Sequence, residues 1–486
     1  MSAIETSCFI GGGFVAGDAG PIRVVNPATD AVIAEVRGVG AALAARAAEA
    51  NGQAARVMRA LPLAKRLELV RRLAADLRAE SGRLANLLTA ESGKPIVESR
   101  GEVEYAASFF DNAAAEAETA AGEMPAARAP DRRILVVREP IGATVAITPW
   151  NFPLAMIARK LAPALAAGCS QLLKPAEDTP LTALAFARIF ERAARETGAP
   201  AGAFGVVVGD PATIAREMIG EPSTRKLTFT GSTEVGRLLA AQCAPRLLRT
   251  ALELGGNAPF IVFADADLDR AVEQAMLTKF RFMGQTCICA NRFLLERPIA
   301  EPFLARLEER MRALAIGDPT LESTRIGPLV NDAAVAKVEA HVADAIAKGA
   351  TLRIGGRRAP VAGLSRRFFL PTLLTGCSPA MHCACEETFG PVVAAMEFSS
   401  EAEALALANG VSYGLAAYVM TQDADRLLRV AESLDFGVIG ANDGAPSTAE
   451  APFGGRKDSG IGKEGGAYGL GAYTDLKYIS LRVRGR

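Results

Sequence analysis

From Ile134 onward, short runs rich in β-branched residues alternate with segments of helical periodicity. The runs QLLK, FGVVVG and KLTFTG are separated by helix-forming stretches, of which residues 179–197 are the clearest. Short continuous apolar runs are typical of strands buried on both faces, and intervening helices are the connections that parallel strands need. The pattern predicts an α/β fold whose parallel sheet is of the nucleotide-binding type.

A second alternating region runs from LELGGNAPFIVF to about Gly440. Near its beginning an amphipathic helix is expected from Asp267 to about Arg281, followed by a polar loop. Residues 122–133 are rich in Ala, Pro and Arg and predict a break in the chain. The tail YTDLKYISLRVR predicts an exposed strand, and exposed strands usually need a partner.

Charge and cysteine content exclude several classes of protein. The chain of 486 residues has 54 Lys and Arg against 54 Asp and Glu, so no excess charge would hold a nucleic acid or a membrane surface. The stretch MSAIETSCFIGGG is acidic where a secretory signal is basic, and prolines interrupt the apolar residues 141–158, so neither a signal nor a membrane helix is expected. Eight irregularly spaced cysteines favour a reducing cytoplasm.

The stretch GQTCICANR contains the best candidate for a nucleophile. Cys287 follows a polar loop of small residues, which would let a substrate approach a thiol closely. The chain has only 2 histidines, the residue that usually activates such a thiol. A carboxylate is then the remaining choice of general base.

Glu253 and Asn151 are the candidates for the other catalytic roles. Glu253 lies in an apolar run, LELGG, where burial would raise its pKa and make it a better base near neutral pH. The alternative is a glutamate on an edge strand that faces water. Asn151, between the two prolines of TPWNFP, has an amide that could bind an oxyanion, although an ordinary turn asparagine is equally compatible with that stretch.

Two further motifs contain residues that could bind a ligand. FTGSTEVG places Gly231 at a strand end and Ser232 as the N-cap candidate of a helix, an arrangement that favours a plain helix cap over an anion site when taken alone. HCACEE offers one imidazole and two thiols, but these ligands are too close together to complete a tetrahedral metal site. No metal is therefore expected.

Taken together, the motifs resemble those of one enzyme family. TPWNFP, KPAEDTP, FTGSTEVG, LELGGNAP, GQTCICANR, EETFGPV and PFGGRKDSG occur in the order found in the NAD(P)-dependent aldehyde dehydrogenases. The resemblance covers essentially the whole chain and is strongest to the succinate-semialdehyde dehydrogenase branch, whose members share the two-cysteine loop. It implies a Rossmann-like cofactor domain (1–121 and 142–254), an α/β catalytic domain (255–463) and a β oligomerisation arm (122–141 and 464–486).

The resemblance also implies roles for individual residues. Cys287 would be the nucleophile, Asn151 and the Cys287 amide would form the oxyanion hole, and Glu253 would activate water. NAD would be the cofactor, with NADP possible, and a carboxylate at Glu177 would disfavour the 2′-phosphate. The cofactor-binding positions would be Trp150, Lys174, Glu177, Gly231, Ser232, Glu387 and Phe389.

The resemblance implies an aldehyde substrate that carries a second acidic group. Arg159, Arg281 and Ser447 fall at the positions that bind a distal carboxylate in similar enzymes. The implied function is oxidation of a short semialdehyde, succinate semialdehyde first, to the dicarboxylic acid, by a cytoplasmic homodimer or homotetramer. Phe282 and Met283 depart from the small or polar residues of the branch and are expected to narrow the pocket or make it more apolar.

Four alternatives remain open at the level of sequence. Glutarate semialdehyde or a broader set of aldehydes would fit the same motifs. A CoA-acylating enzyme would tend to lack Glu253, and an inactive binding relative would not need Cys287, Glu253 and Asn151 together. Cys289, so close to Cys287, is expected to permit a reducible disulfide under oxidation.

Overall fold

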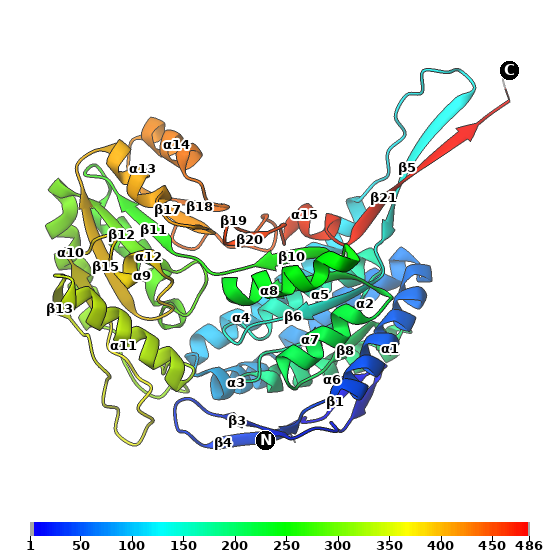
Figure 1. Ribbon diagram of the computed structural model, residues 1–486, viewed down its shortest axis with the longest axis horizontal. Helices are drawn as coiled ribbons and strands as arrows, with labels where there is room; N and C mark the ends of the chain where they lie inside the picture. Colours follow the sequence, from blue (N-terminus) through cyan, green and yellow to red (C-terminus); the bar gives the residue numbers. More distant parts are fainter. Residues whose placement is uncertain (1–3, 485–486) are drawn as a thin grey trace.

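The computed structural model describes residues 4–484 and contains two large sheets, each covered by helices (Figure 1). The first sheet has the order β2-β1-β8-β7-β6-β9-β10-β20. Its central strands, from β8 to β10, run parallel, which confirms the predicted parallel sheet. The strand bounds are β1 Cys8–Ile10, β2 Gly13–Val15, β6 Ala143–Ile147, β7 Ser170–Lys174, β8 Phe204–Val206, β9 Thr224–Thr230, β10 Arg249–Glu253 and β20 Gly460–Ile461.

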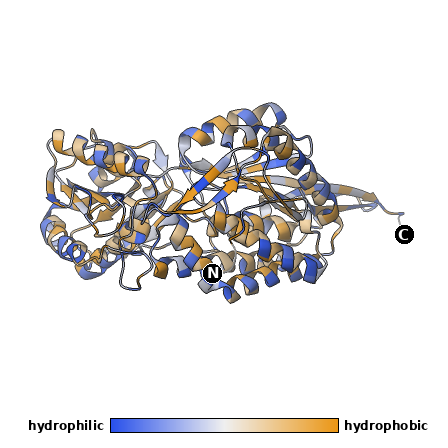
Figure 2. Ribbon diagram, turned by 90° about the horizontal axis from the view of Figure 1, so that it is seen from below, coloured by the Kyte–Doolittle hydropathy of each residue, from blue (hydrophilic) through white to orange (hydrophobic). Residues whose placement is uncertain are grey.

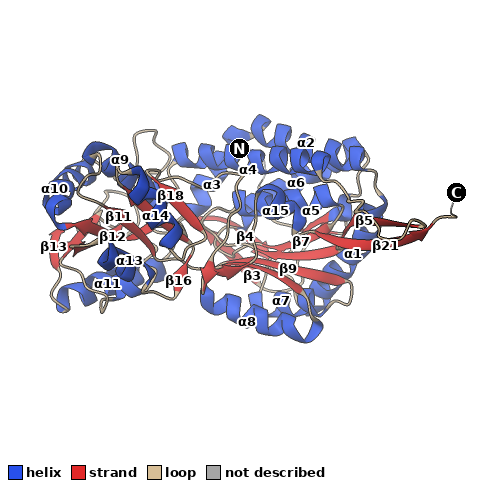
Figure 3. Cartoon of the chain, turned by 90° about the horizontal axis from the view of Figure 1, so that it is seen from above, coloured by secondary structure: helices blue, strands red, loops and turns tan. Residues whose placement is uncertain are grey.

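Helices cover both faces of this sheet (Figure 3), and hydrophobic and hydrophilic residues are mixed along the helices of the molecule (Figure 2). The central strands β6, β7 and β9 are buried along almost their whole length. The helix expected at 179–197 is α6, which starts at Pro180 and stops at Gly198, whose φ of +70° suits a residue without a side chain. The helix bounds are α1 Ala41–Ala60, α2 Leu63–Ala79, α3 Ser81–Ser92, α4 Ile96–Thr119, α5 Ala155–Ala167, α6 Pro180–Thr197, α7 Pro211–Gly220, α8 Thr233–Cys243 and α15 Gly466–Gly471.

The second sheet has the order β13-β14-β15-β12-β11-β17-β18, and only the β13 edge is antiparallel. Its strands are β11 Ala258–Val262, β12 Ala290–Glu296, β13 Thr351–Ile354, β14 Thr372–Thr375, β15 Val392–Phe398, β17 Ala416–Met420 and β18 Val438–Ala441. Its helices are α9 Leu268–Phe280, α10 Arg297–Arg312, α11 Asp332–Ala347, α12 His382–Cys385, α13 Glu401–Asn409 and α14 Ala424–Ser433. Two small antiparallel two-stranded sheets also occur, β3 Pro21–Val25 with β4 Val32–Arg37, and β16 Tyr413–Gly414 with β19 Arg456–Lys457.

A two-stranded ribbon extends from the body of the molecule (Figure 1). It consists of β5 Arg132–Pro140 and β21 Thr474–Arg482, which pair antiparallel along their whole length. The run ILVV, which begins the alternating sequence pattern, belongs to this ribbon and not to the first sheet. The domain boundaries predicted from sequence stay a prediction, and their ends at residues 1–3 and 485–486 lie outside the described residues. Across residues 4–484, no helix is both long and apolar enough to cross a lipid bilayer.

The candidate site residues lie where the two sheets meet. In the first sheet the strand order reverses between β6 and β9, and ligands of such sheets bind at the carboxyl ends of the strands at this point. Trp150 and Asn151 follow β6, and Gly231 follows β9. The loop of Cys287 precedes β12 and Glu387 precedes β15, so the second sheet contributes residues at the amino ends of its strands. The chain passes directly from the end of β10 into the start of β11. The carboxyl ends of the first sheet's strands therefore lie next to the amino ends of the second sheet's strands.

Candidate active site

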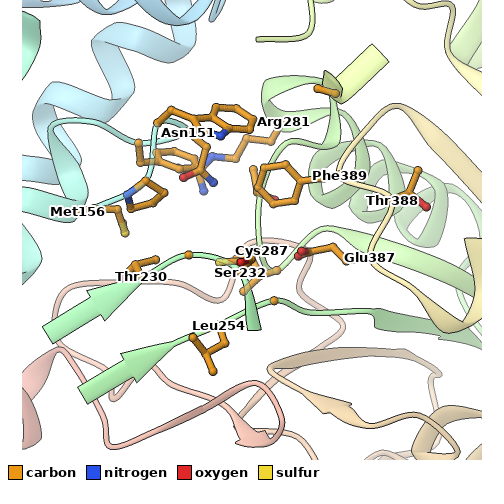
Figure 4. A pocket seen from close by; sticks show the side chains of 18 of the residues that line it. Asn151, Met156, Thr230, Ser232, Leu254, Arg281, Cys287, Glu387, Thr388 and Phe389 are labelled. Carbon is orange, nitrogen blue, oxygen red and sulfur yellow. The ribbon is translucent and has the colours of Figure 1, made fainter. Parts of the chain in front are cut away.

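A cavity of about 380 Å³ lies between the two facing sheet edges (Figure 4). It is bordered by Cys287 and Asn151, two of the three predicted catalytic residues. It is also bordered by five of the predicted cofactor residues and by all three predicted substrate residues, which are Trp150, Gly231, Ser232, Glu387, Phe389, Arg159, Arg281 and Ser447. Residues that are up to several hundred positions apart in sequence therefore share one cavity.

The loop that carries Cys287 has an unusual backbone. Helix α9 ends at Phe280 and a short 3₁₀ segment follows, within which Phe282 and Met283 have φ values of 46° and 54°. Bulky residues rarely adopt this left-handed conformation, and it persists only where surrounding contacts hold it. One such contact is the hydrogen bond from the Phe282 amide to Oε2 of Glu98, at 2.7 Å.

This backbone turns Phe282 and Met283 away from the cavity. Both side chains are fully buried, and the Phe282 ring packs against the rings of Trp150 and Phe152. Neither residue lines the cavity, so the expectation that they narrow the pocket is wrong. Sequence alone places them next to the nucleophile, but the left-handed turn decides the direction of their side chains.

The Cys287 thiol is half-buried at the cavity wall. Burial raises its pKa to about 12, the carboxylate of Glu387 adds to the increase, and the guanidinium of Arg159 acts in the opposite direction. A thiol reacts as its thiolate, so this site needs a further positive charge nearby before the thiolate becomes abundant at neutral pH.

Asn151 is buried and held from two sides. Its side-chain Nδ2 donates to the carbonyl of Gln285 at 3.0 Å, which connects it to the cysteine loop. Its own carbonyl accepts from the Nζ of Lys94 at 2.8 Å. A primary amide has two hydrogens, so one N–H of Asn151 stays available to a ligand in the cavity. This is not an ordinary turn asparagine.

The segment after Asn151 is fixed by an acidic residue from a neighbouring helix. Helix α4 packs against α5, and the Oε1 of Glu102 accepts from the amides of Leu154 and Ala155 at 2.9 and 3.2 Å. A carboxylate at a helix N-terminus satisfies free amides and complements the helix dipole. The other oxygen of Glu102 pairs with buried Lys94, so α4 anchors the whole Asn151 segment.

Glu253 ends strand β10 and is 2% exposed, which excludes the edge-strand alternative raised by its sequence. Both of its carboxylate oxygens are buried and have no hydrogen-bond partner among the described residues. Burial raises its pKa well above the ordinary range, and the neighbouring Glu464 adds to the increase. The next two residues, Leu254 and Gly255, line the cavity. Glu253 therefore lies directly behind the cavity wall, in surroundings that favour its protonated form.

The neighbouring acid, Glu464, has the opposite character. Burial works to raise its pKa, but the charges of Lys160 and Arg159 outweigh this and lower it. Its Oε1 accepts from the Nζ of Lys160 at 2.6 Å and from the hydroxyl of Thr228 at 3.0 Å. The pKa values of these two neighbouring carboxyl groups are therefore driven apart, which favours the proton on Glu253 and the charge on Glu464.

The other end of the cavity is positively charged. The Nη2 of Arg159 donates to the hydroxyl of Tyr105 and, at 3.3 Å, to the Oγ of Ser447. The Tyr105 hydroxyl lies 2.6 Å from Ser447 Oγ. Arg281 is close to the same tyrosine, with its guanidinium carbon 5.9 Å from the ring centre. Arg159, Arg281 and Ser447 thus converge, as predicted.

Tyr105 is a site residue that sequence reasoning missed. It lies on α4, in a stretch without any recognisable motif, and its hydrogen-bond partner Ser447 is 342 positions away. Local patterns carry no signal of such a contact. Only the packing of α4 against α5 brings the tyrosine to Arg159.

The wall near Glu387 has the features of a cofactor site. One oxygen of Glu387 accepts from the amide of Gly256 at 3.0 Å, which leaves Oε2 available to a hydroxyl group. Burial raises the Glu387 pKa to about 7. Phe389, with φ 56°, presents its ring to Trp150 at a centroid distance of 5.4 Å. A free acceptor beside a flat apolar wall suits a ribose with its attached ring, so these residues fit a nicotinamide nucleotide.

The remaining cofactor candidates occupy the carboxyl edge of the first sheet. Ser232 caps α8 by accepting from the amide of Val235 at 3.3 Å, as its sequence position predicted. Lys174, the last residue of β7, forms an ion pair with Glu177, whose side chain is 40% exposed. Lys174 and Glu177 do not line the cavity but lie beyond it along the same edge, where the far half of a dinucleotide would extend.

Cys289 faces away from Cys287. Its sulfur is buried and lies 3.3 Å from the Nζ of Lys279, a residue of α9. Cys287 and Ile288 line the cavity, whereas Cys289 does not. The redox role expected for Cys289 stays a prediction, and it requires the sulfur to leave this lysine.

Comparison with known proteins agrees with the geometry. The model of the aldehyde dehydrogenase family matches residues 14–479. The chain is 46% identical to a 3-sulfolactaldehyde dehydrogenase of Pseudomonas putida (99% of this chain, 98% of that protein). It is 46% identical to a glutarate-semialdehyde dehydrogenase of Pseudomonas aeruginosa (97% of each). It is 45% identical to an NADP⁺-dependent succinate-semialdehyde dehydrogenase of Escherichia coli (95% and 94%).

Solved structures show the same fold. The succinate-semialdehyde dehydrogenase of Burkholderia pseudomallei superposes with a TM-score of 0.96, at 48% identity, covering 99% of this chain and 98% of that one. The betaine aldehyde dehydrogenase of Staphylococcus aureus, solved in complex with NAD⁺, gives a TM-score of 0.95 at 34% identity, with coverage of 99% and 96%.

Proposed function

We propose that this chain, which belongs to the aldehyde dehydrogenase family, oxidises a short semialdehyde to the corresponding dicarboxylic acid. It is an NAD(P)-dependent dehydrogenase. Succinate semialdehyde is the proposed substrate. The observation that carries this proposal is a pair of arginines that no carboxylate of the described residues contacts directly, in the same cavity as the Cys287 thiol.

Neither arginine has a direct ion-pair partner among residues 4–484, and the carboxylates of Glu464 near Arg159 and of Glu98 near Arg281 act only at longer range. Arg159 is 4% exposed, and its Nε is buried without a hydrogen-bond partner among the described residues. Among the described residues, no carboxylate oxygen lies within 4.0 Å of the Arg159 or Arg281 guanidinium. A buried cation without a partner is costly, and an anionic group of the substrate would relieve that cost. A guanidinium fork also matches the two oxygens of a carboxylate.

Semialdehydes place a carboxylate and an aldehyde at opposite ends of a short chain. With the carboxylate at Arg159 and Arg281, the aldehyde carbon would be presented to the sulfur of Cys287. The free N–H of Asn151, together with the Cys287 backbone amide, would bind the oxygen of the resulting tetrahedral adduct. In this arrangement the bond from Nδ2 to the Gln285 carbonyl orients the side-chain amide, and Lys94 holds the backbone of Asn151.

NAD(P)⁺, when bound, supplies the hydride acceptor and a positive charge beside the thiol. On the protein side, Glu387 and Phe389 would hold its ribose and ring, and Lys174 and Glu177 the distant ribose. Glu253 would take a proton from the water that releases the acid from Cys287. To act as a base, Glu253 must be deprotonated. The charged groups next to it are Glu464 and Lys160, which would influence that step.

We also propose that NAD is preferred over NADP. A carboxylate that binds ribose hydroxyls repels a 2′-phosphate, and Glu177 would be that carboxylate. Two alternative functions, a CoA-acylating enzyme and an inactive binding relative, are less well supported. Glu253, Cys287 and Asn151 are all present, and all lie at or directly behind one cavity.

The ribbon of β5 and β21 supports a homodimer or homotetramer. Isolated two-stranded ribbons are marginally stable in water, and unpaired strand edges attract other strands. Large apolar side chains of β21 are exposed in the single chain, namely Leu476, Tyr478, Ile479 and Leu481. A second copy of the chain is the proposed partner that covers them.

A specificity panel tests the proposed substrate. Values of kcat/KM are measured with succinate semialdehyde, glutarate semialdehyde, 3-sulfolactaldehyde and uncharged butanal, each with NAD and with NADP. The proposal expects succinate semialdehyde to exceed butanal by at least about tenfold, the effect of one hydrogen bond to a charged group. Equal values for butanal overturn it. A higher value for glutarate semialdehyde keeps the semialdehyde class and corrects the chain length.

A further inference from the structure

We propose that Tyr105 is the positioning residue that gives the cavity its selectivity for an anionic substrate end. The inference rests on the proposed function, since it assigns a new residue to the same semialdehyde site. Tyr105 would act through Ser447, whose hydroxyl it forces to donate toward the cavity. It would also hold two arginines close together without neutralising them.

The first hydrogen-bond polarity follows from the chemistry of the groups. A guanidinium only donates, so in the Arg159 to Tyr105 bond the tyrosine oxygen is the acceptor. In the Tyr105–Ser447 contact, at 2.6 Å, either oxygen could be the donor, and we assign the proton to Tyr105 because its phenol is the more acidic hydroxyl. Ser447 Oγ also accepts from Arg159 at 3.3 Å. Its two acceptor positions are thereby filled, and its own hydrogen is left to point at another group.

Ser447 lines the cavity, so that hydrogen is available to a ligand there. The anion end of the cavity consequently presents donors from three separate elements, namely α5, the turn after α9 and the loop after β18. A terminal carboxylate satisfies such a set, whereas a methyl group leaves every donor unpaired. Tyr105 thus converts serine, which is able to donate or accept, into a donor.

The ring of Tyr105 has a second effect. The guanidinium carbons of Arg159 and Arg281 lie 5.7 and 5.9 Å from its centre. An aromatic face attracts cations through its quadrupole. The Tyr105 ring itself packs in a tilted arrangement against the Phe109 ring, at a centroid distance of 4.7 Å. An acidic residue at position 105 would support the arginines equally well but would cancel their charge. A neutral acceptor with a π face stabilises both cations and leaves their charge to the substrate.

The test uses Tyr105→Phe, which keeps the ring and removes only the hydroxyl. We expect KM for succinate semialdehyde to rise about tenfold with kcat changed less than about twofold, and kcat/KM for butanal to stay within about twofold. A second readout does not depend on catalysis. Succinate, an unreactive dicarboxylate, should raise the melting temperature of the wild type and have a clearly smaller effect on the variant. Tyr468→Phe, on the exposed surface of α15, is the matched control.

A double-mutant cycle examines the route of the effect. Ser447→Ala should cause a similar selective loss, and adding Tyr105→Phe to it should cause little further loss, because the tyrosine acts through that serine. Fully additive losses overturn this part of the inference. Tyr105→His, whose shorter side chain would not reach both partners, should show the same selective loss if the Phe protein does not fold.

The outcomes separate the inference from the function on which it rests. A wild type that does not prefer the charged aldehyde overturns the proposed function. A wild type with that preference, whose Tyr105→Phe variant keeps it fully, overturns only the role of Tyr105. Equal loss on succinate semialdehyde and butanal makes Tyr105 a structural residue and likewise overturns the inference.

Discussion

The ammonium of Lys160 donates to the carboxylate of Glu464 at 2.6 Å, with both side chains buried. This pairing keeps the charge on Glu464, and that charge helps to keep the nearby Glu253 protonated. The pKa of the general base in the proposed mechanism is therefore raised in part by a neighbouring ion pair.

The first prediction concerns pH. Because the Glu253 pKa is raised, its basic form is scarce at low pH and increases as pH rises through that pKa, so hydrolysis of the acyl enzyme should accelerate in the same direction. Glu464→Gln removes the adjacent negative charge and should shift this rise to lower pH, on the order of one unit. The steady-state rate of NADH production as a function of pH measures it.

The initial NADH burst is the internal control for this prediction, because it reports the steps of Cys287 and precedes hydrolysis. Its pH dependence should change much less in Glu464→Gln. Glu464→Asp, which keeps the charge, should stay close to the wild type. A steady-state profile that is identical in the Gln variant would contradict the coupling of the two acids.

The second prediction concerns the arginines. Arg281→Ala and Arg159→Ala should each reduce kcat/KM for succinate semialdehyde by about tenfold to over a hundredfold, because a hydrogen bond to a charged group contributes about 1.5 to 3 kcal/mol. Butanal should be affected much less. Arg270→Ala, at the exposed start of α9, is the control. Similar losses on both aldehydes would argue against a carboxylate at this end of the cavity.

The third prediction concerns cofactor choice. Glu177→Ser should raise kcat/KM for NADP by about tenfold, since it removes the charge that repels a 2′-phosphate. Glu177→Asp should retain the wild-type preference. Initial rates with each cofactor at saturating aldehyde measure the effect. A wild type that already prefers NADP would show that Glu177 does not have this role.

The fourth prediction concerns Cys289. Activity lost on brief treatment with dilute peroxide should return with a thiol reductant in the wild type and not in Cys289→Ala, because a disulfide with Cys287 protects the nucleophile from further oxidation. Cys243→Ala, a buried cysteine of α8, is the control. Equal recovery in both proteins would leave Cys289 as a packing residue beside Lys279.

The fifth prediction concerns the cysteine loop. Glu98→Ala leaves the Phe282 amide without its carboxylate partner and should lower the free energy of unfolding by about 1 to 3 kcal/mol. Glu98→Gln retains an acceptor oxygen and should lose less. Urea unfolding measures both. If the alanine variant is as stable as the wild type, the left-handed backbone at Phe282 is held by other contacts.

The sequence predicts some residues of the site better than others, for physical reasons. Cys287, Asn151 and Gly231 lie on short segments at the ends of strands, where composition and chain order already mark the position, and the structure brings them to one cavity. The buried state of Glu253 was one of two open alternatives, because a single strand does not reveal its neighbours. β10 lies between β9 and β20, and that pairing decides the question.

Other features had no local signal at all. Glu464 contacts Lys160 across 304 positions, and Tyr105 contacts Ser447 across an even longer separation. The short separation in sequence between Met283 and Cys287 predicts a side chain in the pocket. The positive φ of Met283 instead directs the side chain into the protein core. Tertiary packing and rare dihedral angles are the two kinds of information that this sequence did not display.

The meeting of two sheet edges gives the site a modular design. The reactive thiol and Asn151 come from segments next to strands of different sheets, so their spacing depends on how the two sheets are placed. The charged end is assembled from α4, α5, the turn after α9 and the loop after β18. New aldehydes are therefore best sought by changing Tyr105, Arg281 or Ser447 at that end, because Arg159 also acts on the charges of Cys287 and Glu464.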